Sequence, residues 1–313
     1  MKVLITDEVA KEAIEKLKEK HEVVFKELRG EELAKEIADY DALMVRSATK
    51  VTADIIRAAK NLKVIGRAGI GVDNIDIEEA SRHGIYVVNS PGGSTRSVAE
   101  LSIGMMFALA RKITKADASM KRGEWAKKKL KGIELQGKVL GLIGSGRIAQ
   151  EVAKIASCLG MKILVYSPHC TPEKARSMNA ELKTIEEIFS ESDFISLHVP
   201  LTKETHHMID ANLLSKMKPT AYLINCARGG VVDEDALYEV LKKGAIAGAA
   251  MDVYENEPYS GKLAELDNII LTPHIGASTK EGQIRAGVIC AEQIMKVLDG
   301  KQPDYWVNKD MMK

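Results

Sequence analysis

The chain has 313 residues, a length typical of two domains, and carries 45 basic against 44 acidic side chains. This near balance gives no net field toward nucleic acid or an acidic membrane, so an anionic ligand must be met by local cations. Four cysteines stand far apart without a C-x-x-C pair, which argues against a zinc site or a disulfide framework and favours reduced, cytoplasmic thiols.

The first residues include Asp7 and Glu8 where a signal peptide has an apolar stretch, so no export is expected. Strands are then expected at KVLIT, EVVF, ALMV, KVIG and IYVV, separated by helical segments such as residues 11–20 and 52–60. Because β-branched runs alternate with amphipathic helices, the fold class is α/β with a parallel, doubly wound sheet that ends near Asn89.

The turn-rich stretch PGGSTRS follows as a hinge candidate, and one long helical run is expected from Ser97 to about Trp125. Its apolar part, residues 101–110, falls short of the roughly 20 residues that span a bilayer, so we expect it at a domain or subunit contact. A second series of strands runs through KVLGLIG, KILVY, FISLHV, AYLINC, AGAAMDV and NIILTPH. The closing helix, about residues 279–299, has no evident place on that second sheet.

A glycine-rich turn in GLIGSGRIAQ connects the first strand of the second series to a helix. Gly144 would allow the tight turn, Gly146 the approach of a pyrophosphate, and Ala149 the close packing of helix on sheet. The N-terminus of the helix then offers unpaired N–H groups to phosphates. The arrangement predicts a dinucleotide-binding domain, although a bare G-x-G-x-x-A pattern also occurs where glycines only ease a bend.

The next strand, KILVY, is followed by Ser167, where an acidic residue commonly accepts the ribose hydroxyls of NAD and repels the 2′-phosphate of NADP. A serine removes both the charged acceptor and the repulsion. His169, Lys174 and Arg176 are nearby cations for a 2′-phosphate, or simply a solvated face. We expect NAD by a narrow margin, because a serine hydroxyl also bonds a ribose, and NADP stays open.

Three charged or titratable residues follow the last strands: Arg228, Glu257 and His274. The carboxyl ends of parallel strands border the ligand crevice of an open α/β sheet, so all three are expected to converge there. Arg228 could hold a carboxylate and polarise an adjacent carbonyl, while His274 moves a proton and Glu257 orients its ring. Each residue alone could also be without a catalytic role: Arg228 as a cation in a turn, Glu257 as a solvated acid, and His274 as a histidine at the end of a strand. Together they predict hydride transfer to or from a nicotinamide.

The order of motifs resembles the D-isomer-specific 2-hydroxyacid dehydrogenases, through DALMVRSATKVTADII, VIGRAGIGVDNID, TRSVAEL, GLIGSGRIA, NCARGGVVDE and TPHIGASTKE. The resemblance covers almost the whole chain and is strongest to the members that oxidise D-3-phosphoglycerate. It implies a Rossmann domain, residues 93–284, inserted in a flavodoxin-like substrate-binding domain, residues 1–92 and 285–313. The closing helix then belongs to the substrate domain, and a cleft between the domains would exclude water during the reaction.

By this resemblance Arg228, Glu257 and His274 match the family's catalytic arginine, glutamate and histidine, and Arg228 and His274 also contact the substrate. It implies the following cofactor contacts: Gly144, Gly146, Arg147, Ile148, Ser167, His198, Pro200, Thr205, Cys226, Ala227, Asp252 and Gly276. The remaining histidines are expected to lie on the surface or cap elements, and their spacing predicts no metal site.

A phosphorylated substrate needs cations beyond Arg228, and Arg46 and Arg67 stand at strand ends of the first unit. The resemblance assigns them, with Ser47, to phosphate or carboxylate contacts. Backbone N–H groups around Gly69 and Ile70 would complete an anion nest, although Ile70 replaces a threonine that relatives often have. The alternatives are that Arg46 pairs with Asp41 or Asp54 and that the glycines only allow a bend.

The expected reaction is therefore oxidation of D-3-phosphoglycerate to 3-phosphohydroxypyruvate with NAD, the first step of L-serine synthesis. A glyoxylate or hydroxypyruvate reductase using NADP and a dinucleotide-sensing corepressor-like protein are the alternatives. The resemblance also predicts a homodimer, through the helix from Ser97 and the segment GEWAKKKLKG. Because the chain reaches Lys313 soon after the closing helix, a short form without a C-terminal regulatory domain and without serine inhibition is expected.

Overall fold

The computed structural model describes residues 1–312, which divide into two compact units. Unit 1 comprises Met1–Thr95 together with the chain from Ala277 onward, and unit 2 comprises Arg96–Gly276, so unit 2 is inserted in unit 1. The second division between the units lies between Gly276 and Ala277, whereas the expected one, between residues 284 and 285, falls inside helix α12 (Lys280–Leu298). This helix is continuous and belongs entirely to unit 1.

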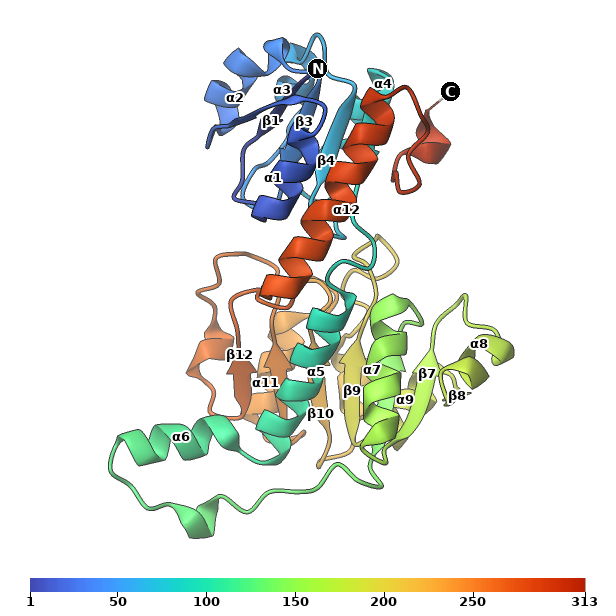
Figure 1. The fold of residues 1–313 in the computed structure, drawn as a ribbon. Helices are drawn as coiled ribbons and strands as arrows, with labels where there is room; N and C mark the ends of the chain where they lie inside the picture. Colours follow the sequence, from blue (N-terminus) through green and yellow to red (C-terminus); the bar gives the residue numbers. More distant parts are fainter. Residues whose placement is uncertain (313) are drawn as a thin grey trace. The chain divides into compact units, whose positions relative to one another are not determined.

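Unit 1 is built on a parallel sheet of five strands in the order β2-β1-β3-β4-β5 (Figure 1). The strands are β1 (Lys2–Ile5), β2 (Glu22–Phe25), β3 (Ala42–Val45), β4 (Val64–Arg67) and β5 (Tyr86–Val88). This strand order is that of flavodoxin-like folds, as the family resemblance implied. All five strands match the expected ones in position.

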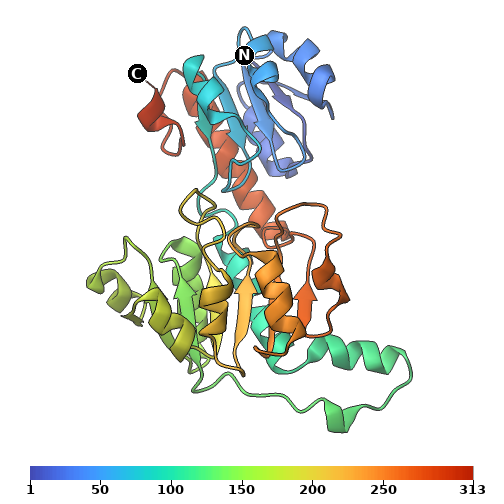
Figure 2. The ribbon, with the colours of Figure 1, turned by 180° about the vertical axis from the view of Figure 1, so that it is seen from behind.

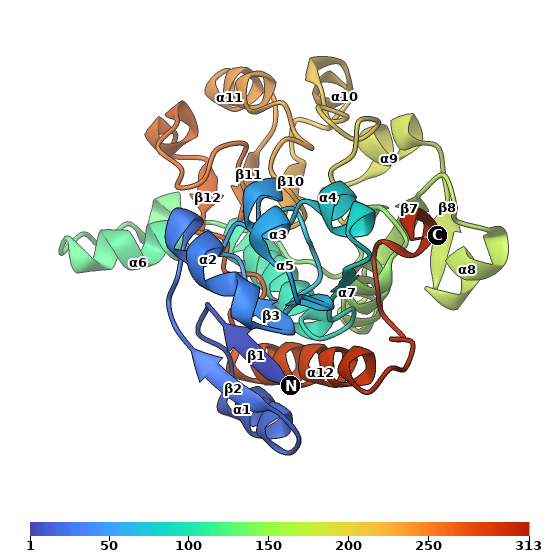
Figure 3. The same cartoon turned by 90° about the horizontal axis from the view of Figure 1, so that it is seen from above.

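Helices cover both faces of this sheet, which explains why the central strand β3 is apolar and buried at every position rather than at alternate ones. One face packs against α1 (Lys11–Lys18) and α12, and the other packs against α2 (Gly30–Glu36), α3 (Ala53–Ala58) and α4 (Ile77–Arg82) (Figure 3). Short 3-10 turns lie at Ile37–Asp39 and Lys309–Met311. The packing of α12 on α1 and β4 gives the closing helix its place in the fold.

Unit 2 is built on a parallel sheet of seven strands in the order β12-β11-β10-β9-β6-β7-β8. The strands are β6 (Val139–Ile143), β7 (Lys162–Tyr166), β8 (Ala180–Leu182), β9 (Phe194–Leu197), β10 (Tyr222–Asn225), β11 (Gly248–Met251) and β12 (Ile269–Leu271). The direction of the strand order reverses between β6 and β9, which is the switch point where dinucleotides bind in Rossmann folds. The two-domain α/β fold is thus confirmed. Strand β8 was not predicted, since its short sequence AEL is partly exposed and carries a charge.

The helices of unit 2 also form two layers. On one face lie α5 (Thr95–Ala110) and α7 (Arg147–Cys158), and on the other α9 (Ile185–Glu191), α10 (Ala211–Ser215) and α11 (Glu234–Lys242) (Figures 1 and 2). Helix α8 (Pro172–Ser177) flanks β8, and 3-10 turns lie at Lys127–Lys129 and Lys262–Glu265. Among residues 1–312, none of the helices combines the length and apolarity that crossing a bilayer requires.

The single helical run expected from Ser97 to Trp125 is wrong. Helix α5 ends at Ala110, and a separate helix, α6 (Ile113–Lys121), begins after Lys112. Lys112 has φ of 53°, in the left-handed region, where a right-handed helix cannot continue. Helical periodicity alone does not register one such residue, so the sequence could not locate the break.

Candidate active site

Three neighbouring strands of unit 2, β10, β11 and β12, are followed by polar or charged residues at the same edge of the sheet. Arg228 lies three residues after β10, Asp252 directly after β11 and His274 three residues after β12. Glu257 lies in the segment that follows β11. Because the strands are parallel, their carboxyl ends share one edge, which is where ligands bind in open α/β sheets.

His274 and Glu257 form a hydrogen-bonded pair in which Nδ1 and Oε2 are 2.8 Å apart. The other carboxylate oxygen, Oε1, accepts a hydrogen bond from the backbone N–H of Tyr254 at 3.1 Å. An ionised carboxylate can only accept, so Nδ1 of the imidazole must be the donor. The pair therefore leaves Nε2 as the atom for proton exchange, on a side chain that is 47% exposed.

His274 stands in a conformation that needs outside support, since its φ of 53° is unusual for a residue with a side chain. The support comes from Asp252, a buried carboxylate that accepts from the backbone N–H groups of Ile275 and Gly276, both at 2.8 Å. It also accepts from Oγ1 of Thr272 at 2.6 Å. Sequence reasoning expected Asp252 and Gly276 to be cofactor contacts. In the structure the Gly276 N–H donates to the Asp252 carboxylate, and this bond helps to fix the loop that carries His274.

Arg228 is half-buried, and its Nη1 donates to the carbonyl of Ala227 at 2.7 Å. Its backbone is fixed by Asn225, whose amide nitrogen donates to the Arg228 carbonyl at 3.0 Å and whose amide oxygen accepts from Ala227 N–H at 3.0 Å. Sequence reasoning missed Asn225. The available signal was a polar side chain at the end of the otherwise apolar strand AYLINC.

The glycine turn adopts the geometry that a dinucleotide site needs. Gly144 has φ of 108°, and a Cβ there would lie 2.4 Å from the carbonyl oxygen of His198, so no larger residue fits. A Cβ at Gly146 would meet nothing within 4 Å, which leaves open space before the first residues of α7, Arg147 and Ile148. The cradle and the N–H groups at the start of this helix fit a pyrophosphate.

Ser167 follows the last residue of β7 directly and is half-buried. Its hydroxyl lies 3.4 Å from the backbone nitrogen of His169. Among the cations nearby, Arg176 forms an ion pair with Glu173 at 2.8 Å on the exposed surface.

The remaining cofactor candidates of unit 2 lie in the loops beyond β9 and β10. His198 directly follows β9, its Nε2 is 3.0 Å from the hydroxyl of Ser196, and burial lowers its pKa to about 3, so the ring stays neutral. Burial raises the pKa of Cys226 to about 12, so that thiol stays protonated. Thr205 donates from its hydroxyl to the Pro200 carbonyl at 2.7 Å and so organises the loop after β9. These groups can line a site without exchanging protons.

The substrate candidates of unit 1 lie at the carboxyl ends of β3 and β4. Arg46 and Ser47 directly follow β3, and Arg67 is the last residue of β4. The Arg46 guanidinium donates to the backbone carbonyl of Glu8 at 3.0 Å. The proposed alternative pairings of Arg46 are not formed, because Asp41 pairs with Lys63 and Asp54 pairs with Arg57.

The loop after β4 carries Gly69 and Ile70. Gly69 N–H donates to the Arg67 carbonyl at 2.8 Å, and the Asn89 side chain donates to the Ile70 carbonyl at 2.7 Å. A Cβ at Gly69 would lie 1.4 Å from Nη1 of Arg67, so glycine allows the arginine to fold over the turn. This set belongs to unit 1, whereas Arg228, Glu257 and His274 belong to unit 2.

All four cysteines are free thiols: Cys158, Cys170, Cys226 and Cys290. Within residues 1–312, no group of three or more histidine, cysteine, aspartate or glutamate side chains has an arrangement that could hold a metal ion.

Sequence comparison identifies the family. Residues 103–276 match the NAD binding domain of the D-isomer specific 2-hydroxyacid dehydrogenases. A D-3-phosphoglycerate dehydrogenase of Methanocaldococcus jannaschii is 54% identical over 98% of this chain, and the chain spans 59% of that relative's length. A hydroxypyruvate reductase of Thermotoga maritima is 52% identical, over 95% of this chain and 98% of its own length.

Structural comparison agrees. The NAD⁺-bound 3-phosphoglycerate dehydrogenase of Entamoeba histolytica has a TM-score of 0.83 and is 35% identical, over 99% of each chain. The turn at Gly144, the start of α7 and the polar carboxyl edge of the sheet lie in the part of the chain that matches the NAD binding domain. The chain belongs to the D-isomer specific 2-hydroxyacid dehydrogenase family.

Proposed function

We propose that this chain oxidises D-3-phosphoglycerate to 3-phosphohydroxypyruvate with NAD, the reaction that begins L-serine synthesis. The observation that carries the proposal is the 2.8 Å pair of His274 and Glu257 at the strand edge that also carries Arg228. A general base oriented by a carboxylate, beside an arginine, suits the oxidation of a 2-hydroxy acid. The identity of 54% to a D-3-phosphoglycerate dehydrogenase supports the choice of substrate.

In this mechanism, the substrate loses a proton from its 2-hydroxyl and a hydride from carbon 2. Arg228 binds the carboxylate and polarises the developing carbonyl, and Nε2 of His274 accepts the hydroxyl proton. Glu257 keeps Nδ1 protonated and stabilises the imidazolium that forms. NAD supplies the hydride acceptor when it is bound at the turn of Gly144 and the start of α7.

For the phosphate of the substrate, we propose Arg46 and Arg67, with Ser47 and the backbone N–H groups of the loop that carries Gly69 and Ile70. Two guanidinium groups match the charge of a phosphate that carries close to two negative charges. The assignment of Arg46 is supported by its contacts: its guanidinium bonds a backbone carbonyl, and no carboxylate within residues 1–312 forms an ion pair with it.

Replacing Arg46 by alanine should raise KM for D-3-phosphoglycerate about tenfold and change kcat less than about twofold, because the lost contact is present in both the ground state and the transition state. Initial rates over a range of substrate concentrations measure this. Arg57→Ala, which removes a surface cation paired with Asp54, is the control and should leave KM unchanged. An unchanged KM in Arg46→Ala would exclude Arg46 as a phosphate contact.

A second candidate function is the reduction of hydroxypyruvate. The Thermotoga maritima relative named hydroxypyruvate reductase is matched over 98% of its length, so its extent is close to that of this chain. Hydroxypyruvate lacks the phosphate, so its reduction should depend little on Arg46. Substrate preference therefore distinguishes the two candidates, and a dinucleotide-sensing protein without turnover would show neither activity.

Initial rates of the wild-type chain test the proposal directly. With D-3-phosphoglycerate at mildly alkaline pH and a product trap, we expect reduction of NAD at least about ten times faster than reduction of NADP, because the matched domain is an NAD binding domain and the similar Entamoeba histolytica enzyme binds NAD⁺. A preference for NADP would instead assign a 2′-phosphate site to the cations near Ser167. Slow oxidation of D-3-phosphoglycerate combined with fast reduction of hydroxypyruvate would favour the second candidate.

We also propose a homodimer. Helix α6 and the segment that follows it extend away from the sheet of unit 2 (Figures 1 and 2). This arm exposes large apolar side chains, with Trp125 at 79%, Met120 at 55% and Ile113 at 51%. Exposed apolar side chains that gather on a projecting arm are typical of a subunit contact. Sedimentation equilibrium of the whole chain tests this state, and a monomer at micromolar concentration would contradict it.

A further inference from the structure

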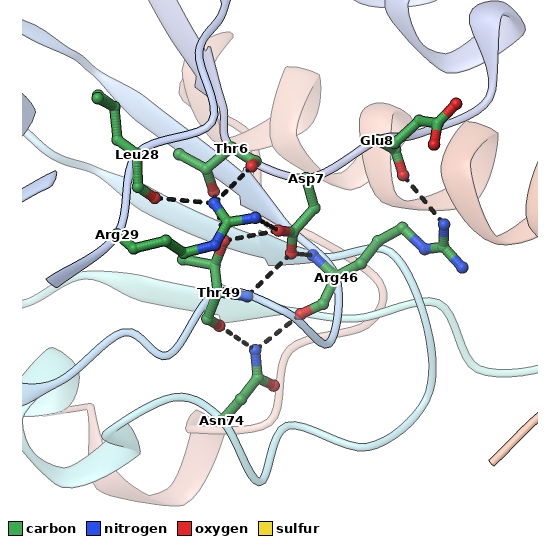
Figure 4. Close-up of polar contacts among 8 residues, drawn as sticks. All are labelled: Thr6, Asp7, Glu8, Leu28, Arg29, Arg46, Thr49 and Asn74. Atoms are coloured by element: carbon green, nitrogen blue, oxygen red, sulfur yellow. Dashed lines mark hydrogen bonds and ion pairs between the residues drawn. The ribbon is translucent and has the colours of Figure 1, made fainter. Parts of the chain in front are cut away.

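A buried carboxylate, Asp7, lies beside the Arg46 loop in unit 1. Asp7 follows β1, and Arg46 follows β3, the strand paired with β1 in the sheet. The side chain of Asp7 is only 3% exposed, whereas Arg46 is half-buried and Ser47 and Ala48 are exposed. Figure 4 shows the Asp7 carboxylate at the centre of the network, between Arg29, Thr49 and Arg46.

Asp7 directs its hydrogen bonds to the two ends of this loop. Its Oδ2 accepts from the backbone N–H of Arg46 at 2.5 Å and from that of Thr49 at 3.2 Å, and its Oδ1 accepts from the Thr49 hydroxyl at 2.7 Å. One carboxylate thus closes the turn from Arg46 to Thr49. The two exposed residues between them, Ser47 and Ala48, are therefore held from both ends.

Asn74 holds the same loop through its carbonyl groups. The Asn74 amide nitrogen donates to the Arg46 carbonyl at 2.7 Å and to the Thr49 carbonyl at 2.6 Å. Both the N–H and the C=O of Arg46 are therefore held, by Asp7 and by Asn74. The Arg46 side chain extends away from this network, toward the carbonyl of Glu8 (Figure 4).

Arg29 compensates the buried charge. Its Nη2 bonds Oδ1 of Asp7 at 2.7 Å, while Nη1 donates to the backbone carbonyls of Thr6 and Leu28 at 2.7 and 2.8 Å. A buried carboxylate is costly without a cation, and Arg29 supplies one at Oδ1, the oxygen that also accepts from the Thr49 hydroxyl. With Arg29 engaged by three acceptors, Arg46 is the arginine of this cluster that can turn to a ligand.

We propose that Asp7 is the positioning residue of an anion-binding loop, residues 46–49, and sets the affinity for the phosphate of the substrate without contacting it. The exposed residues Ser47 and Ala48 lie between the two backbone N–H groups that Asp7 holds, so the network fixes a segment that faces solvent rather than the core. The inference rests on the proposed function, in which Arg46 and Ser47 bind the phosphate. It adds the residue that keeps them in place.

The test is Asp7→Asn in the full chain. An amide keeps the size of the side chain but offers one acceptor oxygen instead of two, so the loop loses part of its anchor. We expect KM for D-3-phosphoglycerate to rise about tenfold, kcat to change less than about twofold, and KM for hydroxypyruvate to change less than about threefold. The contrast between the two substrates is the readout that a general loss of folding would not produce.

Asp41→Asn is the matched control. Asp41 precedes β3 at the opposite end of the same sheet, accepts from the Lys2 N–H at 2.8 Å and pairs with Lys63 at 3.3 Å. It is therefore also a carboxylate that holds a backbone N–H beside a cation. Its loss should lower the melting temperature and leave both KM values unchanged.

If Asp7→Asn is too unstable because Arg29 loses its partner, the double variant Asp7→Asn/Arg29→Gln removes both charges and should show the same contrast in KM. An unchanged KM for D-3-phosphoglycerate in a folded variant overturns the inference. An equal loss with both substrates also overturns it, because Asp7 would then be merely structural.

Calorimetric titration separates this inference from the proposed function. If the wild type binds D-3-phosphoglycerate without oxidising it, the proposed function fails, and weaker binding by Asp7→Asn still supports the role of Asp7. Equal binding by the two proteins overturns that role. If the wild type neither binds nor oxidises D-3-phosphoglycerate, there is no phosphate site to position, and both proposals fail.

Discussion

Replacing His274 by alanine should lower kcat for D-3-phosphoglycerate oxidation about a thousandfold while leaving the affinity for NAD unchanged. A positioned general base contributes on the order of 10² to 10⁴ in rate, and His274 is held at Nδ1 by Glu257 with Nε2 left for the substrate. Steady-state rates give kcat, and quenching of protein fluorescence by NAD gives the affinity. His83→Ala, which removes a histidine near Glu79 in unit 1, is the control and should leave kcat unchanged.

Replacing His274 by alanine should also change the pH dependence of the reaction rates. In the wild type, only neutral His274 accepts the hydroxyl proton, so oxidation should accelerate as the pH rises and reduction should accelerate as it falls. The alanine variant should lose this opposition between the two directions. Glu257→Gln should lower kcat about ten- to a hundredfold, since the base remains but loses the carboxylate that orients it. A kcat within about threefold of wild type in His274→Ala would exclude this histidine as the base.

The positions of the catalytic candidates were predictable because each follows a strand that is easy to recognise. β10, β11 and β12 are short apolar runs, and parallel strands place their carboxyl ends at one edge by topology alone. It was therefore predictable that Arg228 and His274 would share an edge. The glycine turn was predictable for the same reason, since Gly144 directly follows an apolar strand and lies just before a helix.

The supporting residues could not be predicted, because their role depends on contacts between distant parts of the chain. Asp7 bonds a loop 39 residues away, and Asn74 bonds the same loop from a distance of 28 residues. Nothing in the periodicity of the sequence marks such pairs. Asp252 illustrates the same limit: its place after β11 was evident, whereas its bonds to the His274 loop depend on the register of β11 and β12.

The break after α5 has a different cause. Residues on both sides of Lys112 favour a helix, and the interruption depends on one backbone conformation, the left-handed one, which lysine rarely adopts. Helix propensities are small, so tertiary contacts readily override them. One such tertiary contact lies at the end of α5, where the Ile133 N–H donates to the Ala110 carbonyl.

Gly229→Ala should be the most damaging change that leaves every polar side chain in place. A Cβ at this position would lie 1.8 Å from the carbonyl oxygen and 2.0 Å from the carbonyl carbon of Tyr254. Backbone atoms cannot yield as a flexible side chain can, so one of the two segments must move. We expect the free energy of unfolding to fall by about 3 kcal/mol, within the range for severe overpacking. Thermal or urea denaturation measures this loss.

The displacement would also reach the catalytic groups, because Gly229 directly follows Arg228 and the Tyr254 segment leads to Glu257, which is bonded to the Tyr254 N–H. A shift of about 1 Å in a catalytic group can cost on the order of a hundredfold in rate, so kcat/KM of the folded variant should fall at least that much. Gly104→Ala is the control, since a Cβ there meets nothing within 4 Å in helix α5 and alanine favours a helix. If Gly229→Ala kept both wild-type stability and wild-type kcat/KM, the close approach of these two segments would not govern the site, and the roles of Arg228 and Glu257 would have to be reassigned.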